Sequence, residues 1–266
     1  MTVSILGCGW LGRPLAERLV AAGHAVRGST RTAARLSELA ALGVDARRLD
    51  LDTADAGELA AFAQGDALVV SVPPGGVADD AAAMRRVGDA ARSAAVRRVV
   101  FTSSTSVYPD PPRVVTEADA GPTDALPLRR SGPAVWAAEN ALRATVGDRL
   151  VVLRLGGLVG RDRQPARFLA GRRGVPRPRA PVNLVHQRDA VRAIERALDE
   201  SLAPGAYSVV APEHPSREAY YTAEATRLGL APPHFAEDAA GGKTVSPATF
   251  EAATGWRAAW RPGDAV

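Results

Sequence analysis

The strongest constraint on the fold is a glycine-rich turn near the start of the chain, where Gly7, Gly9 and Gly12 follow the spacing G-x-G-x-x-G. Apolar residues of strand type precede the turn at 3–6, and residues 15–20 continue it with helical spacing. Gly7 permits a tight turn, Gly9 lets backbone N–H groups approach a pyrophosphate, and Gly12 lets the helix lie close to the strand. Because a helix N-terminus attracts phosphates, this arrangement predicts a dinucleotide-binding turn. The alternative is a glycine-rich turn that binds nothing.

Strands and helices alternate along most of the chain, which predicts right-handed crossovers and a parallel sheet. The expected fold class is α/β, a Rossmann-type doubly wound parallel sheet with a small C-terminal substrate lobe. We expect the Rossmann domain at 1–160, with 188–210 returning to it, and the lobe at 161–187 and 211–266. The predicted strands are 2–6, 24–31, 45–52, 67–72, 98–102, 150–155 and 206–210, and the predicted helices are 11–22, 33–42, 56–62, 79–95, 133–146, 188–201 and 216–228.

Composition narrows the possible environments and partners. No apolar run approaches the ~18 residues of a membrane span, and no leader-like segment precedes the first strand. A single cysteine, Cys8, cannot form an internal disulfide, so we expect a cytoplasmic protein. The net charge is only +4, and Lys243 is the one lysine, so the many arginines do not indicate nucleic-acid binding. No metal site is predicted.

The end of the second strand indicates which nicotinamide cofactor to expect. NAD-type sites usually place an Asp or Glu there to bind the ribose 2′-OH. This chain has Ser29, Thr30 and Arg31 instead, with Arg35 one turn further on. Two hydroxyls and a guanidinium suit a 2′-phosphate, so we expect NADP(H) rather than NAD(H), unless Arg31 only begins a solvated helix. The other predicted cofactor contacts lie in the glycine-rich turn, near the end of the third strand and after the fourth strand: Trp10, Leu11, Asp50, Leu51, Pro73 and Pro74.

Three further segments carry a family resemblance. Residues 101–108 (FTSSTSVY), 154–160 (RLGGLVG) and 182–189 (VNLVHQRD) follow the turn in this order. Together they resemble the extended short-chain dehydrogenase/reductase family, the NAD-dependent epimerase/dehydratase group. The glycine spacing departs from the usual G-x-x-G-x-x-G and looks like an atypical subgroup. The resemblance implies an NAD(P)-dependent oxidoreductase or epimerase/dehydratase that acts on a small anionic substrate, such as a nucleotide sugar or a carbonyl compound.

The resemblance also implies a catalytic serine, and it shows that the family's catalytic tyrosine and lysine are absent from their usual positions. In the family, the position of Ser104 polarises the substrate, and a Tyr-x-x-x-Lys pair moves the proton. Here Ser131 and Val135 occupy the Tyr and Lys positions, and no Tyr-x-x-x-Lys occurs in the chain. Three possibilities remain open. Another acid such as Tyr108 or His186 could act, hydride transfer could need little help from an acid, or the protein could catalyse no reaction. We name Ser104 and Tyr108 as catalytic candidates, expect a structural role for His186, and keep a non-catalytic NADP(H)-binding redox sensor as the alternative.

An arginine-rich segment follows the sixth predicted strand, between residues 161 and 179. In the resembling family this segment lines the substrate pocket, so Arg163 and Arg167 are predicted to bind an anionic small-molecule substrate. A solvated loop would look the same. The segment has no interleaved aromatic residues, which argues against nucleic acid. Ala-rich helices beginning at 79 and 133 could pair two copies into a homodimer, or they could simply cover the sheet.

Overall fold

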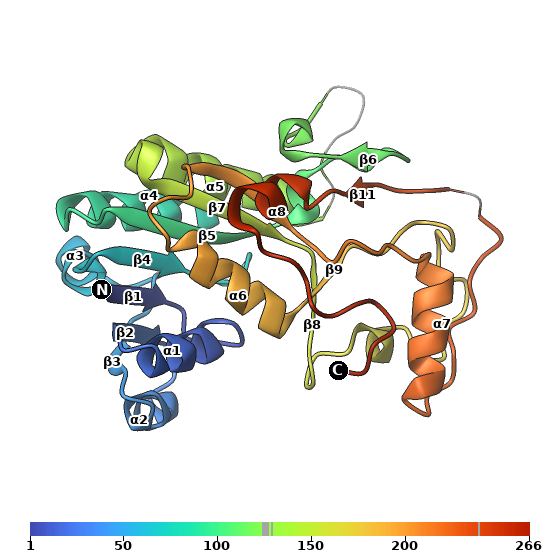
Figure 1. The fold of residues 1–266 in the computed structure, drawn as a ribbon, viewed down its shortest axis with the longest axis horizontal. Coiled ribbons are helices and arrows are strands. Elements are labelled where there is room, and N and C mark those ends of the chain that lie inside the picture. The colour runs from blue at the N-terminus through green and yellow to red at the C-terminus, as the bar shows by residue number, and fades with distance from the viewer. Residues whose placement is uncertain (124–127, 129, 239) are drawn as a thin grey trace. The chain divides into compact units, whose positions relative to one another are not determined.

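A computed structural model describes residues 1–123, 128, 130–238 and 240–266. The chain divides into two compact units (Figure 1). Unit 1 comprises Met1–Ser103, Arg130–Arg154 and Val191–Tyr207, and unit 2 comprises Ser104–Arg129, Leu155–Ala190 and Ser208–Val266. This division assigns residues 104–129, 155–160, 188–190 and 208–210 to unit 2, whereas the sequence analysis placed them in the Rossmann domain.

The central sheet has seven strands in the order β10-β7-β5-β4-β1-β2-β3. The pairs β1–β2, β2–β3, β1–β4 and β4–β5 are parallel. The order reverses beside β1, which creates the switch point where doubly wound sheets bind ligands. The predicted Rossmann-type α/β class is therefore confirmed. The strands are β1 (Thr2–Leu6), β2 (Ala25–Thr30), β3 (Asp45–Arg48), β4 (Ala67–Val70), β5 (Arg98–Ser104), β7 (Leu150–Leu155) and β10 (Gly205–Val209).

One predicted strand end is wrong. The sequence extended the third strand to residue 52, but β3 ends at Arg48. Asp50 begins a turn there, because its carboxylate accepts a 3.1 Å hydrogen bond from the Asp52 amide and its carbonyl accepts one from the Ala54 amide. Short polar side chains favour such turns over continued strand structure.

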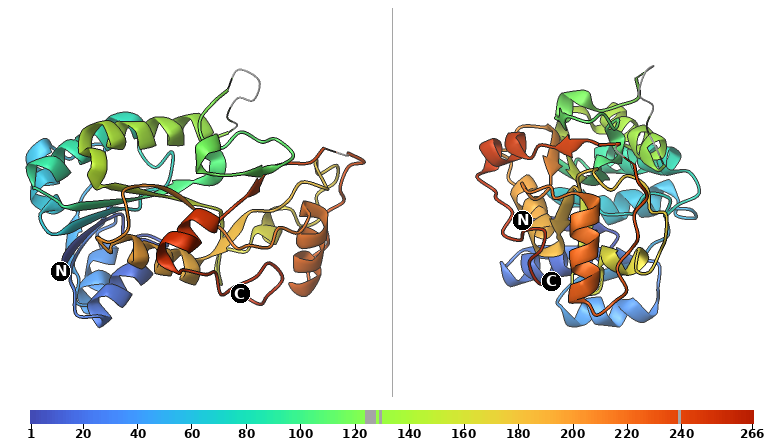
Figure 2. Two further views of the ribbon diagram at one scale, coloured as in Figure 1. Left: turned by 45° about the horizontal axis from the view of Figure 1, so that its top comes forward. Right: turned by 90° about the vertical axis from the view of Figure 1, so that its right-hand side faces the viewer.

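Helices cover both faces of the sheet in unit 1. In the left view of Figure 2 the yellow-green α5 lies above the sheet, and the blue α1 and α2 lie below it. Leu59, Met84 and Leu142, from the helices α3, α4 and α5, share one buried apolar cluster with Phe101 of β5. The helices are α1 (Gly12–Ala21), α2 (Ala34–Ala41), α3 (Ala56–Ala63), α4 (Asp80–Ser93), α5 (Gly132–Val146) and α6 (Gln187–Ala197).

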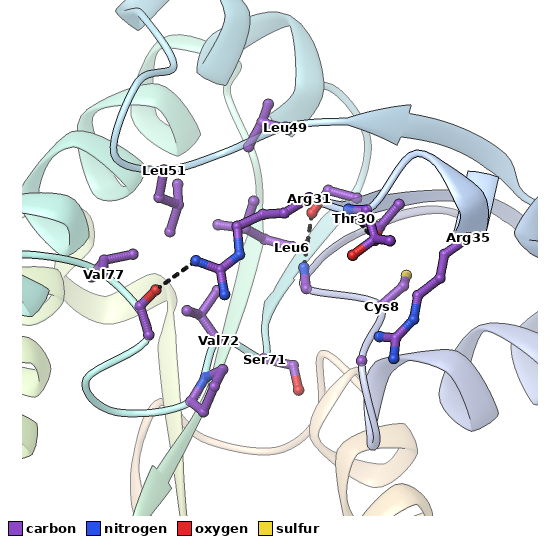
Figure 3. A pocket seen from close by; sticks show the side chains of 16 residues that line it. Leu6, Cys8, Thr30, Arg31, Arg35, Leu49, Leu51, Ser71, Val72 and Val77 are labelled. Atoms are coloured by element: carbon purple, nitrogen blue, oxygen red, sulfur yellow. Dashed lines mark hydrogen bonds between the residues drawn. The ribbon is translucent and has the colours of Figure 1, made fainter.

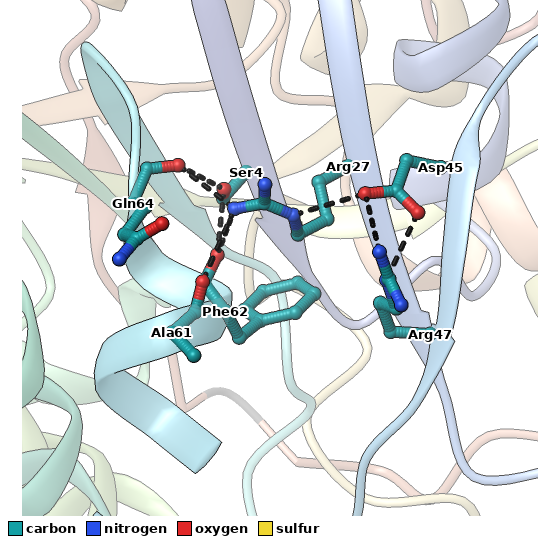
Figure 4. A network of polar contacts seen from close by, with 7 residues as sticks. All are labelled: Ser4, Arg27, Asp45, Arg47, Ala61, Phe62 and Gln64. Atoms are coloured by element: carbon teal, nitrogen blue, oxygen red, sulfur yellow. Dashed lines mark hydrogen bonds and ion pairs between the residues drawn. The ribbon is translucent and has the colours of Figure 1, made fainter. Parts of the chain in front are cut away.

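A polar network joins the end of α3 to the sheet (Figure 4). The Arg27 guanidinium donates hydrogen bonds to the carbonyls of Ala61, Phe62 and Gln64, at 3.3, 3.0 and 2.9 Å. It also contacts the Asp45 carboxylate at 3.2 Å. The last carbonyls of a helix lack partners within the helix, so Arg27 caps α3 and ties β2 to β3 at once.

Unit 2 contains short elements. Two pairs of strands are parallel, β6 (Val114–Val115) with β11 (Thr244–Val245) and β8 (Gly157–Val159) with β9 (Leu184–His186). Its helices are α7 (Arg217–Arg227) and α8 (Ala248–Thr254). The chain also forms 3₁₀ turns at Thr105–Val107, Glu117–Asp119, Gly147–Arg149 and Pro165–Phe168. Within the described ranges of both units, no helix has the length and apolar character that crossing a membrane requires.

Candidate nucleotide-binding site

The glycine-rich turn lies between β1 and α1, and two of its glycines are required by geometry. Gly7 has a φ of +96°, a conformation that side chains with a Cβ rarely adopt. A Cβ on Gly12 would overlap the Gly7 carbonyl and lie 3.2 Å from Ile5 Cγ2. A Cβ on Gly9, in contrast, would meet no atom within 4 Å. The packing of the folded chain therefore does not require glycine at position 9.

Ser29 holds this turn against the end of β2. The Gly7 amide donates a 2.9 Å hydrogen bond to Ser29 Oγ, and the Cys8 amide donates a 2.7 Å hydrogen bond to the Ser29 carbonyl. The Cys8 side chain is buried beneath β2, where a Cβ on Gly28 would lie only 2.6 Å from its sulfur. Burial raises the pKa of the Cys8 thiol to about 12, so Cys8 serves packing and not nucleophilic chemistry.

A cavity of about 240 Å³ opens beside the turn, at the carboxyl ends of the strands (Figure 3). Figure 3 shows Arg31 extending across it, where Nη1 donates a 3.0 Å hydrogen bond to the Gly76 carbonyl. Arg35 extends from α2 into the same space. Among the described residues that line the cavity, none is acidic. The lining consists of Leu6, Gly7, Cys8, Gly9, Ser29, Thr30, Arg31, Thr32, Arg35, Leu49, Leu51, Ser71, Val72, Pro73, Gly76 and Val77.

The structure brings many of the predicted cofactor contacts together. Gly7, Gly9, Ser29, Thr30, Arg31, Leu51 and Pro73 all line the cavity. Trp10, Leu11, Gly12, Asp50 and Pro74 are not among its lining residues. Sequence reasoning did not name Thr32, Leu49, Ser71, Val72, Gly76 and Val77. Leu49 could have been predicted, because residues two apart in an extended chain point to the same side as each other and Leu51 was already named. Ser71 and Val72 could not, because only the pairing of β4 with β1 brings them beside the cavity.

A buried apolar side chain occupies the family position of the catalytic lysine in this protein. Val135 is 1% exposed in α5 and lines a small space together with Pro74, Met84, Phe101 and the acidic residue Asp80. Ser131, at the family's tyrosine position, is exposed just before α5. These two positions show no acid or cation that could carry the family's proton transfer.

One turn beyond Val135, α5 carries a buried ion pair. Glu139 and Arg154 are 0% and 2% exposed, with Arg154 Nη2 at 2.8 Å from Glu139 Oε2. Ser103 Oγ donates a 2.5 Å hydrogen bond to Glu139 Oε1. The pair therefore links α5 to the ends of β5 and β7.

The two catalytic candidates lie in unit 2. Ser104 ends β5 and is half-buried, and its Oγ accepts a 3.1 Å hydrogen bond from the Ser106 amide. Tyr108 is 1% exposed, and its hydroxyl lies 2.6 Å from Ser208 Oγ. Ser104 is thus partly accessible, whereas the Tyr108 hydroxyl is buried in unit 2 and hydrogen-bonded to Ser208.

The remaining candidates of unit 2 occupy different settings. Arg163 and Arg167 are exposed, and Arg167 Nε donates to Gln164 Oε1 at 3.0 Å. His186 ends β9, directly before α6, and its Nδ1 accepts a hydrogen bond from the Arg188 amide. Burial lowers the pKa of His186, and its ring lies 5.9 Å from that of Trp260. Across the described part of the chain, no three His, Cys, Asp or Glu side chains gather in a way that could hold a metal ion.

The fold and the cavity define a nicotinamide-dinucleotide-binding Rossmann protein, and comparison with known proteins agrees. The family model described as NAD(P)H-binding matches residues 7–185, and the chain belongs to this family. It is also 37% identical to protein YeeZ of Escherichia coli K12 over 248 residues, which cover 91% of this chain and 89% of that protein.

Solved structures share the fold across nearly the whole chain. The enzyme WbmG of Bordetella bronchiseptica, in complex with NAD, has a TM-score of 0.77 at 20% identity and covers 98% of this chain and 90% of its own. UDP-glucuronic acid 4-epimerase of Bacillus cereus, also with NAD, has a TM-score of 0.78 at 16% identity, with 99% and 95% covered. These likenesses show that the chain shares its fold with these two proteins.

Proposed function

We propose that this protein binds NADP(H) in the cavity of unit 1 and uses it in oxidoreductase or epimerase/dehydratase chemistry on a small anionic substrate. The observation that carries the cofactor proposal is the cavity lining, which holds Arg31 and Arg35 and, among its described members, no carboxylate. A 2′-phosphate would gain charge-assisted hydrogen bonds from these guanidiniums, and an acidic residue would repel it. The Arg31 contact with Gly76 uses one of five N–H donors, so the others are available to a ligand.

Ser104 is the residue that we propose contacts the reacting group. Its Oγ accepts the Ser106 N–H, and no described residue accepts its proton, so the hydroxyl is oriented to donate to a substrate oxygen. Bound NADP(H) would supply or accept the hydride. Without an adjacent base Ser104 is a weak acid, so it would polarise the substrate and not transfer a full proton. The exposed Arg163 and Arg167 would attract the substrate's negative charge.

A non-catalytic NADP(H) sensor is the second candidate. The buried valine at position 135 and the buried hydroxyl of Tyr108 favour it, because neither side chain is available to transfer a proton to or from a substrate. In either case we expect the protein to act in the cytoplasm, where its one cysteine needs no partner.

Cofactor titration tests the first part of the proposal. Calorimetry with the purified protein should show NADPH binding at least tenfold more tightly than NADH, and Arg31→Asp should reverse that order. Arg85→Asp makes the same charge change on the exposed face of α4 and should leave the ratio intact. Equal affinities for both cofactors in the unmodified protein would overturn the 2′-phosphate argument.

Turnover tests the second part. Oxidation of NADPH should be followed against nucleotide sugars and small carbonyl compounds, with Ser104→Ala compared to Ser37→Ala, an exposed serine of α2. We expect Ser104→Ala to lower kcat by about tenfold or more and to leave the Kd for NADPH unchanged. If no compound is turned over although NADPH binds, the sensor replaces the enzyme.

A further inference from the structure

The only lysine of the chain contacts the turn that follows Ser104. Lys243 Nζ donates hydrogen bonds to the Thr105 carbonyl at 2.8 Å and to the Tyr108 carbonyl at 2.7 Å. These carbonyls stand at the two ends of the 3₁₀ turn Thr105–Val107. The ammonium also lies 5.8 Å from the centre of the Tyr108 ring. All of these residues belong to unit 2.

The backbone of Lys243 is fixed on both sides. Its amide donates a 3.0 Å hydrogen bond to Asp110 Oδ1, and its carbonyl accepts one of 2.9 Å from Asn183 Nδ2. Asn183 Oδ1 in turn accepts the amide of Val245 at 2.7 Å. Because the main chain is held in this way, the ammonium is tethered to a fixed backbone, and its hydrogen bonds to the turn oppose movement of the turn.

We propose that Lys243 is a positioning residue, which holds the turn from Thr105 to Tyr108 and thereby fixes the place of the Ser104 hydroxyl. The proposal rests on the proposed function of Ser104. The turn positions the Ser104 hydroxyl directly, because Ser104 Oγ accepts a hydrogen bond from the amide of Ser106, which lies in the turn. Hydrogen bonds from a charged donor are roughly twice as strong as neutral ones. Without them, the two carbonyls would be free to turn away and would carry Ser106 with them.

The strength of the hydrogen bonds from Lys243 to the turn should depend on pH. The charged groups that face Lys243 are Asp110 and Arg177, and Arg177 Nη1 is paired with Asp110 Oδ2 at 2.5 Å. Desolvation lowers the pKa of Lys243 to about 8, against the opposing effect of Asp110. Above that pH the amine loses its charge, so its hydrogen bonds to the turn weaken and the turn should open more often.

Hydrogen exchange measures this opening without any need for turnover. In the full-length protein at pH 7, Lys243→Met should speed exchange of the 104–110 segment at least tenfold, and Lys243→Arg should restore part of the protection. Arg113→Met is the matched control, since Arg113 pairs with Asp119 on the surface of the same unit and should change exchange of that segment less than threefold. Equal protection in the wild type and in Lys243→Met would overturn the proposal.

A single-site titration covers the case in which Lys243→Met does not fold. Protein labelled with ε-¹³C lysine gives one side-chain signal, because Lys243 is the only lysine. Its midpoint should lie near pH 8, and protection of the 104–110 segment, corrected for intrinsic exchange, should fall through the same range. A midpoint above pH 10 would overturn the pH dependence expected near pH 8. Protection that stays unchanged while Lys243 titrates would overturn the proposal that Lys243 holds the turn.

Turnover separates this proposal from the proposed function. With a substrate in hand, Lys243→Met should lower kcat about tenfold with the KM for NADPH within twofold, and kcat of the wild type should fall above about pH 8. Lys243→Arg should move that fall to higher pH, which a merely structural residue would not do. If nothing is turned over, the function of Ser104 fails while the exchange result still decides whether Lys243 holds the turn.

Discussion

The amide of Gly7 donates a 2.9 Å hydrogen bond to the hydroxyl of Ser29, which joins the glycine-rich turn to the end of β2. The Ser29 side chain is therefore engaged in shaping the turn, although it also lines the cavity. Because the same hydroxyl was predicted to contact a 2′-phosphate, the two roles need to be separated.

Ser29→Ala separates them. Loss of the hydroxyl leaves the Gly7 amide without its partner, so the free energy of unfolding should fall by about 1–3 kcal/mol in urea titrations. Binding of NADPH and NADH should weaken by the same factor, because the turn serves both cofactors. A selective loss of NADPH affinity would instead show that Ser29 contacts the 2′-phosphate, and Ser37→Ala provides the control for a serine outside the cavity.

Two neighbouring glycines should respond oppositely to alanine. Gly9→Ala places a methyl group in open space, so thermal stability should change little while NADPH affinity falls at least tenfold, since the methyl blocks the approach of phosphate. Gly12→Ala pushes a methyl group against the Gly7 carbonyl, so it should destabilise the apo protein by more than ~1 kcal/mol. Unchanged cofactor affinity in Gly9→Ala would argue against pyrophosphate binding at this turn.

The contrast between these glycines shows what the sequence could predict. The glycine spacing, the apolar strands and the helices of unit 1 carry local, periodic signals, and they allowed the Rossmann core to be predicted. Two hydrogen bonds, from Gly7 to Ser29 and from Lys243 to Thr105, join residues that are distant in the chain. No local sequence pattern predicts such contacts. Strands as short as Val114–Val115 and Thr244–Val245 are also invisible to periodicity, so the architecture of unit 2 had to come from the structure.

Cys8 should make the protein sensitive to alkali. Its thiol has a pKa of about 12 when folded against 9.0 without the fold, so between these values the unfolded chain has lost a proton that the folded chain keeps. The contribution of Cys8 to the free energy of unfolding should therefore fall as pH rises above 9. The free energy of unfolding should be measured in urea at pH 8 and at pH 10, and its change between the two should be about 1.4 kcal/mol more favourable in Cys8→Ala than in the wild type. Lys243 is present in both proteins, so its opposite contribution cancels. An identical change in both proteins would show that Cys8 ionises normally in the fold.

Tyr108→Phe tests whether the Tyr108 hydroxyl has a structural or a catalytic role. The substitution removes the 2.6 Å contact with Ser208, so we expect about 1–3 kcal/mol of destabilisation, because the Ser208 hydroxyl stays buried with one partner fewer. Cofactor affinity should not change, and turnover at a temperature well below unfolding should stay within threefold of the wild type. A loss of turnover of more than a hundredfold with full stability would return Tyr108 to the catalytic residues.

The buried pair of Glu139 and Arg154 should be the most sensitive polar contact of unit 1. Both side chains are out of water, so Glu139→Gln leaves the Arg154 guanidinium with no opposite charge beside it and should cost about 3–5 kcal/mol in urea titrations. The double change Glu139→Leu with Arg154→Met removes both charges together and should recover much of that loss, since apolar side chains of similar size pay no desolvation. A double variant as unstable as the sum of its single changes would mean that the two residues act separately. Recovery would instead show that the pair stabilises the contact between α5 and β7 mainly because each charge neutralises the other. Ser103, which donates to Glu139, and its neighbour Ser104 would then lie at the end of a firmly held strand.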